Sequence, residues 1–148
     1  MPEGPGPWTM IVNPAAGRGR TRKLLPELEA AARAANVEMH VSPDPGAPTK
    51  LALAAAEAGR DLVACGGDGL VTEVTGVAAD TNRRLAIVPT GAGNDFARVL
   101  GYDTKKPLAA FAALENGRDR VVDLGRVNGR WYTLPLAMVE KTSLPLTA

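Results

Sequence analysis

Four short apolar, β-prone runs alternate with Ala/Leu-rich stretches of helical length, and this alternation limits the possible folds more than any other feature. The runs are Trp8 to Val12, Val37 to Val41, Asp61 to Cys65 and Leu85 to Val88. Such alternation is typical of a parallel sheet with crossover helices. We therefore expect an α/β fold of three layers, α/β/α, with a mainly parallel sheet.

Apolar residues at three- and four-residue spacing predict the helices between these strands. The expected helices are one within Thr21 to Ala35, one from Thr49 as N-cap to Ala58 with Gly59 as its stop, one over Leu70 to Ala79 and one over Lys106 to Asn116.

The pattern changes to antiparallel β after Asn116. Apolar residues from Val121 to Leu124 lead to the turn pair Asn128-Gly129, and Trp131 and Tyr132 follow. Asn-Gly between two such runs predicts a hairpin. We place a boundary near residue 117, with an α/β domain over residues 8–117 and the truncated start of a β-rich second domain over residues 118–148.

Composition and charge exclude several classes of protein. Hydrophobic residues make up 45% and charged residues 22% of the 148 residues, and no apolar run approaches the about 20 residues of a membrane-spanning helix. A net charge of +1 gives no broad basic field for nucleic acid. Cys65 is the only cysteine, so an internal disulfide is excluded. The N-terminus lacks the pattern of a signal peptide, and we expect a cytoplasmic location.

The segment Val63 to Gly69 runs from an apolar strand directly into three glycines around Asp68 and then into a predicted helix. Glycines let the backbone approach a ligand closely, and the N–H groups at a helix start can bind phosphate oxygens. The motif alone fits equally a tight turn with Asp68 as a solvated cap.

Two more glycine-containing loops leave the same predicted edge of the sheet, where open α/β folds bind ligands. Asn13 to Arg20 follows the first strand, and Pro89 to Arg98 follows the fourth. Neither a Walker A loop nor the dinucleotide fingerprint is present. In the later loop, Asn94 and Asp95 stand where they can cap a helix, bind substrate, or do both.

In their order, these segments resemble the diacylglycerol kinase catalytic family, whose superfamily includes the sphingosine kinases. The matching residues are Asn13-Pro14 with Gly17 and Gly19, then Gly66-Gly67-Asp68-Gly69 with Glu73-Val74, and then Pro89 to Arg98. The resemblance covers roughly Met10 to Val127, and the ordered set is far more specific than any one segment.

The resemblance implies an enzyme, an ATP-dependent lipid kinase that transfers the γ-phosphate of ATP to a hydroxyl of a lipid such as diacylglycerol. It implies Mg²⁺ with the nucleotide, and a catalytic role for Asp68. The implied nucleotide-binding residues are Asn13, Gly17, Arg18, Ser42, Gly66, Gly67, Asp68, Gly69, Leu70, Val71, Thr72, Gly91, Ala92 and Gly93. Asn94 and Asp95 are the candidates for substrate binding, and metal ligands stay unassigned.

The lipid acceptor also implies transient contact with a membrane surface, so that a cytoplasmic protein would work at the inner membrane face. Basic residues from Arg18 to Lys23 surround the first loop. They either screen triphosphate charge or form a solvated helix start, and Arg18 is the first to test. His40 has no partner motif and is expected to be structural or exposed. The sequence does not predict an oligomeric state.

Several positions depart from the family pattern. Leu70 replaces a frequent Thr, Thr72 a frequent Asn, Ala92 a frequent Thr or Ser, and Thr75-Gly76 the usual Asn-Gly pair. These changes predict weakened ATP affinity. The residues from Thr133 onward lack the Gly-Phe-Asp-like strand of the family, so we expect an N-terminal fragment with little activity alone. An NAD kinase-like enzyme and a noncatalytic, degenerate nucleotide-binding paralogue remain the alternatives.

Overall fold

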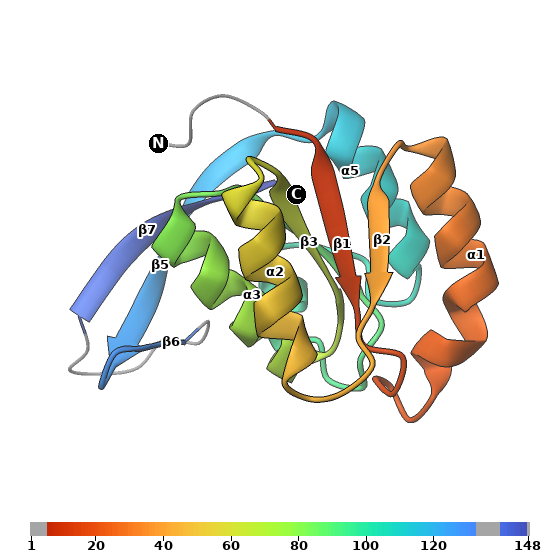
Figure 1. Cartoon of the computed structure of the whole chain (residues 1–148), viewed down its shortest axis with the longest axis horizontal. Coiled ribbons are helices and arrows are strands. Elements are labelled where there is room, and N and C mark those ends of the chain that lie inside the picture. The colour runs from red at the N-terminus through yellow and green to blue at the C-terminus, as the bar shows by residue number, and fades with distance from the viewer. Residues whose placement is uncertain (1–5, 133–139, 148) are drawn as a thin grey trace.

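A computed structural model describes residues 6–132 and 140–147 (Figure 1). They form three layers, a central sheet with helices on each of its faces. The sheet has the strand order β2-β1-β3-β4-β7-β5-β6. The strands β1 (Trp8–Val12), β2 (Glu38–Val41), β3 (Asp61–Gly66) and β4 (Leu85–Pro89) are mutually parallel. The α/β class and the four predicted strands are therefore confirmed.

Among the last three strands, the central one is antiparallel to both of its neighbours. The strand β5 (Asp119–Val127) lies between β6 (Arg130–Tyr132) and β7 (Glu140–Thr147), and β7 pairs with β4 at Leu85 and Leu146. Asn128 and Gly129 have φ of 50° and 77°, as the predicted hairpin turn requires. A domain boundary near residue 117 stays a prediction, and residues 133–139 and 148 of the predicted second domain lie outside the described residues.

Helices cover both faces of the parallel strands. Figure 1 shows α2 (Ala47–Glu57) and α3 (Asp68–Thr81) on one side of the sheet and α1 (Arg20–Ala34) and α5 (Ala110–Asn116) on the other. The short helix α4 (Asp95–Val99) follows β4, and a 3₁₀ turn, η1 (Pro107–Ala109), precedes α5. The single helix expected over residues 106–116 is thus a 3₁₀ turn and an α-helix, with Pro107 at the start of the turn.

Two predicted helix starts are wrong. The helix α2 begins at Ala47 and not after Thr49, because the Asp44 carboxylate accepts hydrogen bonds from the N–H groups of Gly46 (3.0 Å) and Ala47 (3.1 Å). The helix α3 begins at Asp68 itself, two residues before the expected start, so the acid of the glycine motif belongs to its first turn. The stop at Gly59 is confirmed by its φ of 79°.

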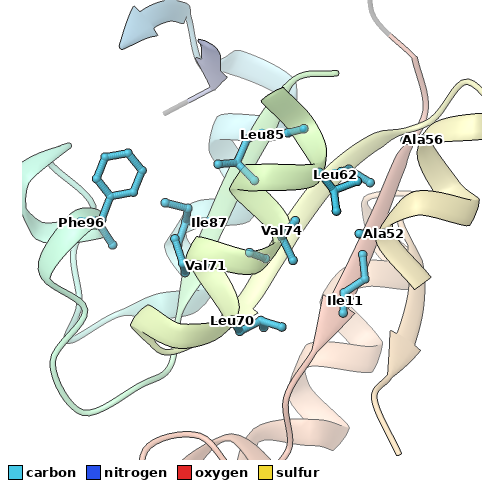
Figure 2. Packing of buried hydrophobic residues seen from close by; sticks show 14 of the residues in the cluster. Ile11, Ala52, Ala56, Leu62, Leu70, Val71, Val74, Leu85, Ile87 and Phe96 are labelled. Atoms are coloured by element: carbon cyan, nitrogen blue, oxygen red, sulfur yellow. The ribbon is translucent and has the colours of Figure 1, made fainter. Parts of the chain in front are cut away.

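The core has two parts because successive strand residues point to opposite faces of the sheet. Ile11, Leu62 and Ile87 pack under α2 and α3 with Val71 and Val74, as Figure 2 shows. Their neighbours on the same strands, including Met10, Val63 and Val88, pack under α1 and α5. These apolar contacts hold the helices so that the loops after β1, β2, β3 and β4 meet at one edge of the sheet.

Candidate functional site

Two of the glycine-containing loops identified in the sequence flank the point where the chain reverses the direction in which it adds strands to the sheet. The chain passes from β1 outward to β2 and then returns to the other side of β1 as β3. Open α/β sheets bind ligands beside the carboxyl ends of their strands at such a switch point. The loop over residues 13–19 and the Gly66–Gly69 segment stand on its two sides.

The glycine motif after β3 is in direct contact with the loop after β4. The Gly66 carbonyl oxygen accepts hydrogen bonds from the N–H groups of Thr90 (3.1 Å) and Gly91 (3.2 Å). A Cβ atom on Gly91 would collide with the Cα atom of Gly67. Glycine is therefore required here by the close approach of two backbones, which brings the second and third motifs together.

Asn94 closes the loop after β4. Its buried side chain accepts a hydrogen bond from the Gly91 N–H at 2.9 Å through Oδ1 and donates one to the Gly91 carbonyl oxygen at 2.7 Å through Nδ2. Both ends of the amide are used inside the protein. The side chain thus positions the loop, while its predicted contact with substrate stays a prediction.

Asp68 and Asp95 bring two carboxylates to the same place. The Asp95 N–H donates a hydrogen bond to Asp68 Oδ1 (2.8 Å), so Asp68 also anchors the start of α4. A Cβ atom on Gly93 would lie 2.8 Å from Asp68 Oδ2 and 3.7 Å from Asp95 Oδ1. Both carboxylates therefore face the side-chain space that Gly93 leaves open.

The start of α3 presents main-chain donors at this edge. The first hydrogen bond of the helix runs from the Val71 N–H to the Gly67 carbonyl oxygen (3.0 Å), so the N–H groups of residues 68–70 have no acceptor within the helix. The side chains of Leu70 and Val71 are buried in the core. The Leu70 side chain packs over Gly66.

The first loop is joined to the others through buried contacts. Gly17 has a φ of 66°, and a Cβ atom there would collide with the Thr90 carbonyl oxygen. The hydroxyl of Thr21 lies 2.7 Å from Thr90 Oγ1 and 3.1 Å from the Ala16 carbonyl oxygen. Both threonines are fully buried. Sequence reasoning missed this pair, because Thr21 lies outside the glycine-containing loops and 69 residues separate it from Thr90.

A cavity of about 390 Å³ opens beside the start of α3. Four of the predicted nucleotide-binding residues line it: Asn13, Ser42, Gly69 and Leu70. The other lining residues are Pro14, Ala15, Arg22, Pro43, Asp44, Pro45, Pro48 and Glu73. The basic side chain at this cavity is Arg22, whereas Arg18 is exposed on the loop and does not line it.

Polar side chains of the cavity hold its loops in shape. Asn13 Oδ1 accepts a hydrogen bond from the Ala15 N–H (3.1 Å), and the Ser42 hydroxyl donates to the Asp44 carbonyl oxygen (2.8 Å). Asp44 was not predicted as a site residue. Its position three residues before the start of α2, in a Pro/Gly-rich turn, is a cap signal that could have found it.

Some predicted residues lie apart from these contacts. Thr72 lines a separate cavity of about 370 Å³ together with Trp131 and Tyr132, and Ala92 is exposed. His40 does not line the cavity beside the start of α3, and its Nε2 atom lies 2.5 Å from Glu38 Oε1. Burial raises the pKa of the Cys65 thiol to about 12, so this cysteine is a core residue without nucleophilic chemistry.

The fold and the site define an α/β protein with glycine-lined loops, a helix start and paired carboxylates at one edge of its sheet. Residues 7–127 match the diacylglycerol kinase catalytic domain family, and the chain belongs to that family. The predicted family is thereby confirmed.

Individual relatives agree with this assignment. The chain is 36% identical over 128 residues to the diacylglycerol kinase of Bacillus subtilis (strain 168), and the match covers 83% of this chain and 42% of that protein. It is also 36% identical over 135 residues to the diacylglycerol kinase of Mycobacterium tuberculosis (strain ATCC 25618 / H37Rv), covering 86% and 44%. The chain spans less than half the length of these relatives.

A crystal structure shows the same fold. A diacylglycerol kinase from Bacillus anthracis str. Sterne superposes with a TM-score of 0.73 at 30% identity, covering 86% of this chain and 48% of that one. Among the described residues, no helix is long and apolar enough to cross a membrane.

Proposed function

We propose that this chain is the nucleotide-binding part of an ATP-dependent lipid kinase that transfers the γ-phosphate of ATP to the hydroxyl of a lipid such as diacylglycerol. The observation that carries the proposal is the meeting of Asp68 and Asp95 beside Gly93, next to the unpaired N–H groups of α3. Membership of the diacylglycerol kinase family supports the reaction class.

The proposed nucleotide lies with its phosphates at the start of α3. There the N–H groups of residues 68–70 would donate to phosphate oxygens, and the positive end of the helix dipole would favour their charge. The cavity lined by Asn13, Ser42 and Arg22 would take the remainder of the nucleotide, and Arg22 is the basic side chain placed to meet it.

The two carboxylates fit a magnesium ion that arrives with the nucleotide. Among the described residues, no group of three or more His, Cys, Asp and Glu side chains could hold a metal by itself. Mg²⁺ commonly takes one or two carboxylates together with substrate phosphates, and Asp68 and Asp95 would supply them. The bound ion would neutralise charge on the phosphates.

Asp68 has two roles in this proposal. Through Oδ1 it holds the Asp95 N–H and so fixes the loop after β4 against α3, while Oδ2 faces the open space at Gly93. Phosphoryl transfer depends mainly on positioning and on charge neutralisation, so a carboxylate held in this way is the expected contribution of the protein. The lipid acceptor and transient contact with a membrane surface belong to the same proposal.

The test is Mg-ATP binding by calorimetry, with the wild type compared with Asp68→Ala and Gly67→Val. We expect saturable binding that both substitutions weaken. Glu57→Ala, at the exposed last residue of α2 and outside the cavity, is the matched control and should bind as the wild type does. Circular dichroism establishes that each variant is folded. A folded wild type that does not bind Mg-ATP would refute the proposal for this chain.

The acceptor is tested on the chain extended by the remaining half found in its relatives. Phosphate transfer from labelled ATP to short-chain diacylglycerol is compared with transfer to NAD. The lipid should be phosphorylated, and transfer to NAD instead would favour the NAD kinase-like alternative. Binding without transfer to either acceptor would favour a noncatalytic nucleotide-binding protein.

A further inference from the structure

The first loop, residues 13–19, has an uncommon backbone conformation. Three consecutive residues, Gly17, Arg18 and Gly19, have positive φ angles of 66°, 58° and 90°. This left-handed conformation is unfavourable for a residue with a side chain, and it persists only where surrounding contacts hold it. Residues 13–15 of the same loop line the cavity beside the start of α3. Contacts that fix this loop therefore also fix one wall of the cavity.

The first loop is anchored at two points. The Asn13 N–H donates a hydrogen bond to the Cys65 carbonyl oxygen at the end of β3 (3.0 Å). Further along, the Ala16 carbonyl oxygen accepts two hydrogen bonds from Thr21, one from its N–H at 3.3 Å and one from its hydroxyl at 3.1 Å. The Thr21 hydroxyl also lies 2.7 Å from Thr90 Oγ1. The second anchor thus extends through side chains to the loop after β4.

Thr90 lies where the three glycine-containing loops meet. Its N–H donates a hydrogen bond to the Gly66 carbonyl oxygen (3.1 Å). Its own carbonyl oxygen occupies the space that a side chain on Gly17 would need. Its hydroxyl completes the link to Thr21 in the first turn of α1. A change at this hydroxyl pair therefore acts on the contact between the first loop and the loop after β4.

The neighbours of the pair indicate which hydroxyl donates. A hydroxyl has one proton to donate and can also accept. The arrangement that satisfies both short contacts has Thr21 donating to the Ala16 carbonyl oxygen and Thr90 donating to Thr21. Both threonines are fully buried, so water does not replace either bond. A further contact of Thr90 Oγ1, with Cys65 Sγ at 3.9 Å, involves a weak partner.

We propose that Thr21 and Thr90 are positioning residues, which hold the first loop in its nucleotide-binding conformation although neither touches the nucleotide. Both are buried, and neither lines the cavity. When a binding-competent conformation is only partly populated, the apparent affinity falls by the same fraction. Loss of the hydroxyl pair should therefore weaken Mg-ATP binding without removing any contact to the nucleotide. This inference rests on the proposed nucleotide-binding function.

The experiment compares three variants without the hydroxyl pair, Thr21→Val, Thr90→Val and the double variant, by Mg-ATP calorimetry and by urea denaturation. Valine has nearly the shape of threonine, so each change replaces one hydroxyl by a methyl group. Thr21→Ser is the rescue variant, because it keeps the hydroxyl. Val37→Ala is the stability control, because it deletes buried methyl groups immediately before β2, outside the cavity.

Affinity and stability should respond differently across this set. Thr21→Val should lose the most stability, because it leaves the buried Thr90 hydroxyl without an oxygen acceptor. Thr90→Val and the double variant should lose less, because neither leaves a hydroxyl stranded. All three should bind Mg-ATP roughly 3- to 10-fold more weakly, a factor that corresponds to one hydrogen bond. Thr21→Ser and the destabilised Val37→Ala should bind as the wild type does.

Hydrogen exchange reports on the loop itself, in the absence of nucleotide. The Ala16 N–H donates to the Asn13 carbonyl oxygen within the loop (3.2 Å). Its exchange should be faster in the three variants without the pair, because local opening becomes easier, and it should be unchanged in Thr21→Ser. Exchange as slow as in the wild type in all three variants would overturn the inference.

Calorimetry separates failure of this inference from failure of the proposed function. Equal Mg-ATP affinity in the wild type and the three folded variants would overturn the inference and leave the proposed nucleotide site standing. An affinity loss that follows stability across the set, Val37→Ala included, would also overturn it, because the pair would then act through stability alone. A folded wild type that binds no Mg-ATP would refute the proposed function and this inference together.

Discussion

Replacing Asp61 by asparagine should lower the free energy of unfolding by about 3 kcal/mol, because it removes the charge at the centre of a buried ion-pair cluster. Asp61 is fully buried at the start of β3, at the end of the sheet opposite the candidate site. Its carboxylate lies 2.9 Å from Arg83 Nη2 and 3.0 Å from Arg84 Nε. It also accepts hydrogen bonds from the N–H groups of Gly6 (2.8 Å) and Arg84 (3.2 Å).

The magnitude follows from what the substitution leaves behind. The two arginine side chains are only 12% and 14% exposed, so water cannot fully replace the lost carboxylate. Removing one partner of a buried ion pair costs about 3–5 kcal/mol. The lower end applies because Arg83 still donates to the Gly59 carbonyl oxygen (2.7 Å), and Arg84 still pairs with Asp119 (3.3 Å).

The assay is urea denaturation followed by circular dichroism, with linear extrapolation to water. In a thermal scan, the same loss should lower the melting temperature by roughly 6–12 °C, since 1 kcal/mol corresponds to about 2–4 °C at this chain length. Glu29→Gln is the control. Glu29 pairs with Arg33 at 3.6 Å, but both side chains are more than half exposed, and the change should cost less than about 0.5 kcal/mol.

A loss below about 1 kcal/mol for Asp61→Asn would refute the reasoning, because it would mean that the arginines are adequately solvated without the carboxylate. An equal loss of stability for Glu29→Gln would also refute the reasoning, because burial of the ion pair would then not explain the size of the loss. Nucleotide binding by folded Asp61→Asn should be unchanged, because the cluster and the candidate site lie at opposite ends of the strands.

Three further predictions concern the loops and the core. Gly91→Ala should weaken Mg-ATP binding at least tenfold and destabilise the fold by about 1–3 kcal/mol, because the added Cβ atom would collide with Gly67. Calorimetry that shows wild-type affinity for Mg-ATP would contradict this prediction. Thr21→Val should cost about 1–3 kcal/mol in urea denaturation, because the buried Thr90 hydroxyl loses its oxygen partner and keeps only the weak contact with the Cys65 thiol at 3.9 Å. A neutral effect would show that the thiol contact is sufficient. Burial raises the pKa of Cys65 from 9.0 to about 12, so the contribution of the neutral thiol to stability is complete below pH 9 and is lost as pH rises toward 12. Cys65→Ala should remove this pH dependence of the free energy of unfolding. The native thiol should resist a disulfide reagent at pH 8 until urea unfolds the chain.

Local features of the sequence were sufficient for the strands, most helices and the three loops. Strands such as Leu62 to Cys65 are apolar on both faces, which marks buried parallel strands. Asn128-Gly129 determines a hairpin through two positive φ angles. Glycine next to a strand end marks a special backbone conformation, and this is why the Gly66–Gly69 segment was identified from the sequence.

Helix starts were less predictable, because a cap depends on which side chain reaches the first N–H groups. Thr49 and Asp44 are both residues that favour caps, and only the folded turn shows that Asp44 reaches them. Among the basic residues of the first loop, the sequence likewise offered no reason to choose Arg22 over Arg18. Arg22 lies on α1 and borders the cavity, whereas Arg18 lies on the loop before this helix and does not, so the tertiary placement of each side chain decides between them.

By itself, then, the sequence determined the α/β class, the family and the positions of its glycine-containing loops, because periodicity and glycine placement act over a few residues. Only the tertiary structure decided that Gly67 touches Gly91, that Asp68 holds the Asp95 N–H, and that Asp61 lies between two arginines. These contacts join residues more than twenty positions apart. They depend on strand order and on the packing of helices against the sheet, which no local pattern of residues encodes.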